Sequence, residues 1–185
     1  MTMRRAFMIV LLASAVVAFV QLPAQAQSFG PSATTTLSVA IGPEASIQIL
    51  TANSGLSANG NAFNSDFIGS TSFTYKIRTT KTGGTGNIGV EVTSDFSPAG
   101  GPSIATPPST GDALAYTCTV TAPGTGCTGA VPASTTAASS VATFGADAHS
   151  AKGGNTGSLN WDLTNDPKYG TGTYSATVTF TISAT

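Results

Sequence analysis

Only a few residues of this sequence have the chemistry of a catalytic group. The single histidine, His149, stands near Asp147 and Ser150 in a loop of small residues. The members of a Ser-His-Asp triad come together in space from separate parts of a chain, so adjacency in sequence is no signature of one. The nucleophile-elbow pattern Gly-x-Ser-x-Gly does not occur in the sequence. We therefore interpret His149 as an exposed loop residue.

Carboxylates are the other candidates for catalysis, because glycoside hydrolysis needs two of them facing each other across a cleft. The acids worth considering stand where turns or outward strand faces are expected: Glu91, Asp95, Asp112, Asp162 and Asp166. Nothing in their spacing along the sequence predicts that two of them face each other across a cleft. We predict that the protein is not an enzyme and carries no metal or other cofactor of its own.

Two features bear on ligand binding instead. Residues 161–167 collect side-chain oxygens after a predicted strand, which suits either a calcium loop or an Asx-type turn before Pro167. Tyr169 stands beside Gly170 and Gly172 and is the aromatic residue that the patterning leaves outside the core, so it is a candidate to stack on a sugar ring. An extracellular carbohydrate-binding module, with or without calcium, is therefore an alternative function.

The cysteines predict a disulfide. Cys118 and Cys127 are the only two in the chain, and residues 123–126 between them have strong turn chemistry. Neither CxxC spacing nor a neighbouring histidine supports metal or redox chemistry. We expect the bond to staple one local hairpin and to contribute about 2–3 kcal/mol by constraining the unfolded chain.

The amino terminus has the order of a secretory signal. Arg4 and Arg5 precede an apolar run over residues 6–20, and Ala24 and Ala26 flank Gln25. The run is shorter than the roughly 20 apolar residues of a spanning helix. We predict a signal helix within residues 1–26, one domain over residues 27–185, and an exported protein that is extracellular, periplasmic or on the cell surface, without a membrane span after cleavage.

Charge is sparse in the predicted mature chain. Residues 27–185 hold five basic and eight acidic side chains, a net charge of −3. Nucleic acids and anionic membranes attract basic surfaces, so we expect neither as a partner. Threonine, serine, asparagine and glycine must supply solubility instead, as on an extended β surface.

Apolar and polar residues alternate with period two along most of the chain, which predicts antiparallel strands with one face in water. The runs cover residues 34–41, 45–50, 72–80, 87–93, 113–121, 141–144, 158–163 and 172–185. About eight such strands predict an all-β, two-sheet antiparallel sandwich, immunoglobulin-like or pilin-like, with a closed barrel as the alternative. Residues 72–80 and 87–93 are expected to pair as a hairpin around a Gly-rich turn.

The first of these runs has two interpretations. Leu37, Val39 and Ile41 alternate with polar or small residues near the start of the predicted mature chain. Such a strand either completes its own domain or is added to the sheet edge of a neighbouring subunit. In the second case these three residues are the contact.

The two ends of the chain resemble a group of exported bacterial β proteins. Residues 33–39 and 172–182, the latter with the pattern Gly-x-Tyr-x-Ala-x-Val, resemble spore-coat-U-like and fimbrial-subunit sandwiches, and Trp161-Asp162-Leu163 is similar to the Trp-x-Leu of bacterial surface domains. Unlike chaperone–usher fimbrial subunits, residues 46–49 contain no cysteine. The resemblance implies a structural or adhesive protein of the cell surface, matrix or an appendage, which associates with itself or with other surface proteins.

Overall fold

The computed structural model describes residues 32, 34–60, 63 and 65–185. The predicted signal peptide, residues 1–26, lies outside the described residues. The strands all lie within one compact unit, Ala40–Thr185. In the described part of the chain there is no helix, and therefore no helix that is long and apolar enough to cross a membrane.

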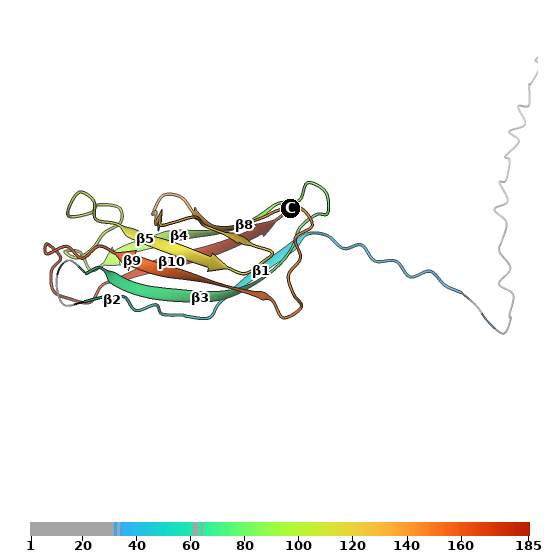
Figure 1. Cartoon of the computed structure of the whole chain (residues 1–185), viewed down its shortest axis with the longest axis horizontal. Helices are drawn as coiled ribbons and strands as arrows, with labels where there is room; N and C mark the ends of the chain where they lie inside the picture. Colours follow the sequence, from blue (N-terminus) through green and yellow to red (C-terminus); the bar gives the residue numbers. More distant parts are fainter. Residues whose placement is uncertain (1–31, 33, 61–62, 64) are drawn as a thin grey trace, which may run out of the picture. The chain divides into compact units, whose positions relative to one another are not determined.

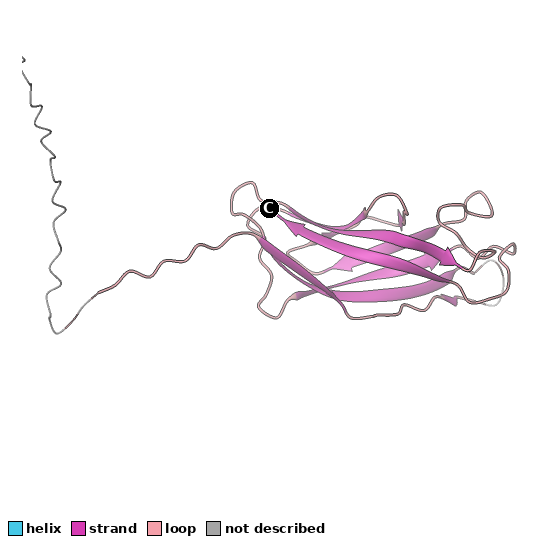
Figure 2. Cartoon of the chain, turned by 180° about the vertical axis from the view of Figure 1, so that it is seen from behind, coloured by secondary structure: helices cyan, strands magenta, loops and turns pink. Residues whose placement is uncertain are grey.

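Ten strands form two antiparallel sheets, which confirms the all-β prediction (Figure 1). Sheet A has the order β1-β3-β9-β5-β7, and β2 shares the β1 edge of β3. Its strands are β1 (Glu44–Ile49), β2 (Ser57–Ala58), β3 (Phe67–Arg78), β5 (Leu114–Val120), β7 (Val131–Pro132) and β9 (Asn155–Leu163). Sheet B has the order β10-β4-β8-β6, with β4 (Gly86–Ser97), β6 (Thr125–Gly126), β8 (Ser139–Phe144) and β10 (Ser175–Ala184). Figures 1 and 2 show the two sheets from opposite sides, with the carboxyl terminus at the end of β10.

The core lies between the sheets and follows from the period-two pattern. Alternate residues of the central strands are buried, and their neighbours face outward. Aromatic rings join the sheets, with centroids 5.8 Å apart for Phe73 and Phe180 and 5.3 Å apart for Tyr75 and Phe144. The largest fully buried side chains are Phe73, Tyr75, Ile88, Val90, Val92, Tyr116, Val141 and Leu159. Full burial of such an apolar side chain contributes about 1.5–3 kcal/mol.

Polar groups in this core are satisfied. The indole N–H of Trp161 donates to Thr71 Oγ1 at 2.8 Å, and the Tyr75 hydroxyl donates to the carbonyl of Thr121. Among the described residues, every buried side-chain nitrogen or oxygen has a hydrogen-bond partner. The core therefore avoids the cost of unpaired polar groups.

The predicted hairpin between residues 72–80 and 87–93 is wrong. Both segments are strands, but β3 pairs with β1, β2 and β9, whereas β4 pairs with β10 and β8. The connection passes from one sheet to the other, because the apolar faces of both strands are buried in the same core. Its turn is tight: a Cβ on Gly84 would stand 2.3 Å from the carbonyl oxygen of Thr80.

Residues 34–41 form no strand in the described structure, contrary to the strand that their alternation predicts. No described strand pairs with them, and an isolated strand cannot satisfy its backbone groups with protein partners. Leu37, Val39 and Ile41 are 91%, 81% and 66% exposed. The first strand of the domain begins only at Glu44, after Gly42 and Pro43.

The disulfide between Cys118 and Cys127 is present, as predicted, with its Cα atoms 5.6 Å apart. It does not staple a hairpin. Cys118 lies on β5 of sheet A, whereas Cys127 follows β6 of sheet B and donates its N–H to the carbonyl of Val141 on β8. The bond therefore ties the two sheets together at one edge. A disulfide is compatible with an oxidising extracellular or periplasmic location.

One carboxylate holds the long loop that follows β4. Oδ1 of Asp95 accepts the N–H of Phe96 and Ile104 at 2.8 and 2.9 Å, and Oδ2 accepts the Ser103 hydroxyl and the Ala105 N–H at 2.6 and 3.1 Å. Burial by itself raises the pKa of Asp95, but these hydrogen bonds outweigh it and lower the pKa below its ordinary value.

We expect Asp95→Asn to lower the free energy of unfolding by about 1.5–3 kcal/mol at neutral pH, since an amide cannot accept all four bonds. The pKa of Asp95 is lower in the folded chain than in the unfolded chain. Its stabilisation is therefore present above the ordinary carboxyl pKa of about 3.9 and is lost as the pH falls through the folded value. Urea unfolding over a pH series measures this. A difference between wild type and variant that stayed constant into acid would contradict the assignment.

Candidate functional site at an open edge

Two edge strands, one from each sheet, contact each other along one side of the domain. β1 is at the edge of sheet A and β10 is at the edge of sheet B. Within the described residues, β10 pairs with β4 alone and β1 with β3 alone. This side of the domain therefore ends in backbone groups without strand partners.

The inner faces of these two strands are incompletely covered. We call their apolar residues the apolar seam: Ala45, Ile47 and Ile49 of β1 with Ala176, Val178, Phe180, Ile182 and Ala184 of β10. All are half-buried except Ile49, which is 36% exposed, whereas the inner residues of β3, β4 and β9 are buried. The inward-facing side chains of a strand remain partly exposed where no further strand lies beside it in the sheet.

The backbone of β10 is available along most of its length. The N–H of Thr185 donates to the carbonyl of Thr85, in register with the β10–β4 ladder. Because antiparallel strands direct alternate residues to opposite sides, the N–H and C=O of Phe180 and Ile182 point away from β4. The strand is ten residues long and holds no charged residue or proline. It therefore lacks two of the usual devices that prevent edge pairing, charge and proline, and its only irregularities of register with β4 lie near its start, between Ser175 and Val178.

The opposite edge is built differently. There the short strands β7 and β6 pair with β5 and β8, and the Cys118–Cys127 bond links the two sheets. A covalent link with short covering strands leaves little edge to extend. The molecule thus has one closed side and one open side.

The predicted contact residues Leu37, Val39 and Ile41 lie in the exposed segment 34–41. The prediction that they join a neighbouring subunit stays a prediction. Sequence reasoning does not predict the apolar seam, because the alternation in residues 172–185 is the same as that of any strand with one face in water. Nothing in a local pattern distinguishes an edge strand from a central one.

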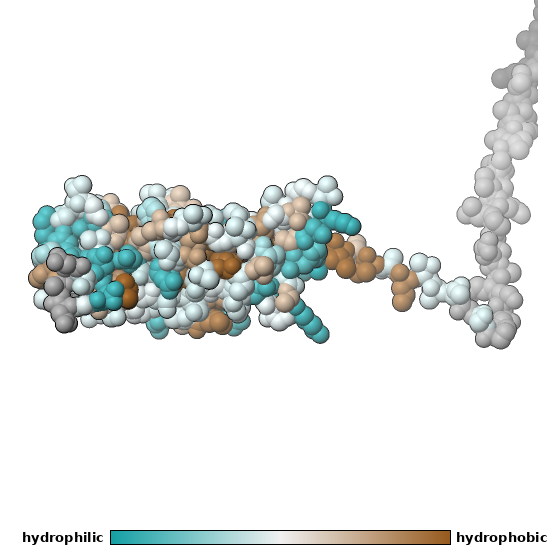
Figure 3. Space-filling view, in the orientation of Figure 1, coloured by the Kyte–Doolittle hydropathy of each residue, from teal (hydrophilic) through white to brown (hydrophobic). Residues whose placement is uncertain are grey.

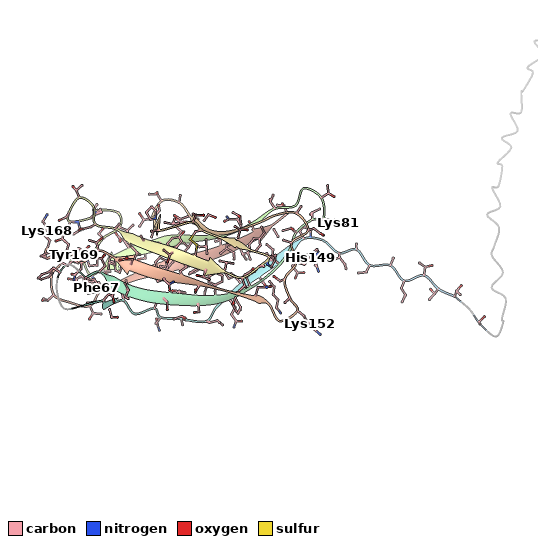
Figure 4. The ribbon with its side chains drawn as sticks, viewed as in Figure 1. Phe67, Lys81, His149, Lys152, Lys168 and Tyr169 are labelled. Carbon is pink, nitrogen blue, oxygen red and sulfur yellow. A yellow bond between two sulfur atoms is a disulfide. The ribbon has the colours of Figure 1, made fainter. Side chains whose placement is uncertain are left out.

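A second region of interest lies at one end of the domain, around Tyr169 (Figure 4). Tyr169 is half-buried and donates its N–H to the carbonyl of Asp166. Burial and the nearby carboxylates of Asp112 and Asp166 raise the pKa of Tyr169 to about 12. The proposed sugar contact at Tyr169 stays a prediction, and its ring is partly covered by the acidic loops.

The fold brings no catalytic partner to His149 beyond its sequence neighbour Asp147, and in the described part of the chain it assembles no metal-ligand cluster around residues 161–167. His149 lies at the end of the domain opposite Tyr169 (Figure 4), and its Nε2 is 3.6 Å from Oδ1 of Asp147, both exposed. Asp166 accepts the N–H of Lys168 at 2.7 Å, and the Ser109 hydroxyl and this N–H lower the pKa of Asp166. Among the described residues, no three His, Cys, Asp or Glu side chains cluster as metal ligands would.

The outer face of sheet A carries an open concave surface of about 650 Å³. Side chains from β3, β5 and β9 line its floor, among them Ser70, Thr117, Asn160 and Asp162. Burial and the carboxylate of Asp66 raise the pKa of Asp162. The proximity of Asp66 and Asp162 has no local signal, since β3 and β9 come together only in the folded sheet.

Compared with protein-family models, with curated proteins and with solved structures, the chain shows no significant match to any of them.

We expect Asp66→Asn to lower the pKa of Asp162 towards its ordinary value without fully restoring it. The substitution removes the neighbouring charge, whereas the burial that also raises the pKa remains. Carboxyl-carbon NMR titration measures it. Asp112→Asn is the control, because Asp112 is not among the groups that shift Asp162. An unchanged pKa of Asp162 in Asp66→Asn would refute the pairing.

Proposed function

We propose that this protein is an exported, non-catalytic structural or adhesive component of the cell surface, the matrix or an appendage. Its two sheets form an immunoglobulin-like or pilin-like sandwich that associates with other protein chains through the apolar seam. The observation that carries the proposal is β10, which combines ten uncharged residues, an unpaired edge and a half-covered apolar face.

Association at this edge has a clear physical reason. A strand added beside β10 pairs with the outward N–H and C=O groups, and its side chains cover Val178, Phe180 and Ile182. Completing the burial of each large half-buried side chain contributes about 1 kcal/mol. The hydrogen bonds fix the direction of the partner, and the side chains fix its register.

Other features support a role outside the cytoplasm. The Arg4-Arg5 signal pattern predicts export, and the Cys118–Cys127 disulfide suits an oxidising compartment. The face seen in Figure 3 is mostly pale, as threonine, serine and glycine make it, with only small hydrophobic patches. Polar but uncharged groups of this kind keep a β surface hydrated without strong charge.

We expect the wild-type protein to form oligomers in solution and Ala176→Lys/Ala184→Lys to be monomeric. Both alanines are small residues of the apolar seam, so the lysines leave no cavity and place charges where the partner must pack. The matched control is Ser175→Lys/Ser183→Lys, with the same charges on the exposed face of β10. Light scattering gives the mass, and circular dichroism checks the fold. Oligomers of the Ala176→Lys/Ala184→Lys variant would contradict association at this edge.

A second candidate is carbohydrate binding, favoured by the concave surface on sheet A. Its hydroxyl, amide and carboxyl groups, at Ser70, Thr117, Asn160 and Asp162, suit the hydroxyls of a glycan. In this case soluble polysaccharides raise the melting temperature of the wild type, and Asn160→Ala abolishes the shift. Thr119→Ala, an exposed position outside the concave surface, is the control. Equal shifts in both variants would place binding elsewhere.

A further inference from the structure

We infer that the apolar seam of one copy receives residues 34–41 of a second copy as an added strand beside β10, so that copies join head to tail. This rests on the proposed function, because it names the occupant of the same edge. The donor segment and the acceptor edge are two different parts of one chain. Each copy therefore carries one of each.

The donor segment has the period that the seam requires. In an extended strand Leu37, Val39 and Ile41 share one face, with successive side chains about 6.6 Å apart. Val178, Phe180 and Ile182 of β10 repeat at the same two-residue interval. Eight residues of donor extend about 26 Å, within the length of the ten-residue β10.

Exposure points to the same pairing. The described large apolar residues that are most exposed include Leu37, Val39 and Ile41, and Ile49 of the seam is also exposed. Large apolar groups left in water in a regular alternating row indicate a contact surface. The apolar side chains of the donor segment and those of the apolar seam are each partly in water, and pairing the two would bury both sets.

Charge does not oppose the contact. The sequence has no charged residue between residues 27 and 43, and β10 has none. Closing the seam with this segment therefore buries no charge, whereas a charged partner strand would have to lose its hydration.

Contacts near β1 favour a second copy over the chain's own seam. Nε of Arg78 donates to the carbonyl of Gly42 at 2.8 Å, and its Nη2 is 3.0 Å from Glu44. Arg78 alternates with the buried Ile77 and Thr79, so it faces outward from sheet A and holds Gly42 on that side. Gly42 immediately follows Ile41, so these contacts anchor the end of the donor segment on the outer side of sheet A, whereas β10 belongs to sheet B.

Joining through different surfaces is heterologous association, which continues into open filaments unless the copies close into a ring. The product expected from this chain is a ladder of masses, each one copy larger than the last.

The test uses the full chain, expressed so that it is exported and then purified. Leu37→Asp/Val39→Asp/Ile41→Asp places three charges on the donor face of a segment that is exposed and outside the strands, so the domain itself stays folded. The matched control, Thr36→Asp/Ser38→Asp/Ala40→Asp, carries the same charges on the opposite face. Light scattering gives the mass, and hydrogen exchange reports protection of the β10 amides.

The expected result is a ladder of oligomers with protected outward amides of Phe180 and Ile182 in the wild type and the control, and an unprotected monomer in the donor-face variant. If the donor-face variant assembles like the wild type, the inference is overturned while association through the edge stands. A wild-type monomer with unprotected β10 overturns both. A wild-type monomer whose β10 protection is lost in the donor-face variant shows insertion into the chain's own seam and overturns the inference.

Discussion

The structure depends on the burial of every second side chain between two facing sheets. Rings from opposite sheets, such as Phe73 with Phe180 and Tyr75 with Phe144, meet in this layer and set how the sheets lie on each other. The same requirement explains why β3 and β4 separate into different sheets instead of pairing. A strand in the middle of a sheet satisfies it completely, because neighbours cover it from both sides. A strand at an edge has a neighbour on one side only, so its inward-facing side chains are not fully covered. The two edges of this molecule differ in how this exposed face is covered.

At one edge the chain closes the layer itself. The short strands β6 and β7 and the Cys118–Cys127 bond link sheet A to sheet B, so this side needs nothing more. At the other edge β1 and β10 leave an apolar seam half-covered, with unpaired backbone beside it. Natural edges are commonly protected by charge, proline or shortness, and β10 has none of these. The contrast makes the open edge the part of the molecule that is best suited to a partner.

The buried and half-buried polar side chains of this protein stabilise its fold through internal hydrogen bonds. Thr71 satisfies the Trp161 indole, Asp95 gathers the loop after β4, and Asp166 caps its own turn. The Asp95 and Asp166 carboxylates accept backbone N–H groups of the loops that they order, and the Thr71 hydroxyl accepts a side-chain N–H in the core. Because these polar groups are used in internal hydrogen bonds, the outer faces of the sheets carry few charges. Such faces suit the structural function that we propose, in which chains associate through surfaces and edges.

The sequence by itself determined the elements, and only the tertiary structure decided their neighbours. Period-two alternation located seven of the strand segments, because it is a local pattern. Cys118 and Cys127 could be identified as disulfide partners because they are the only two cysteines in the sequence. Alternation says which face of a strand is apolar but not what covers it. For that reason the pattern predicts a hairpin from residues 72–80 and 87–93 that the structure does not have. It also does not show that β10 is an edge strand or that Asp66 lies near Asp162. Strand pairing and edge position are relations between residues far apart in the chain, and they exist only once the sheets have assembled.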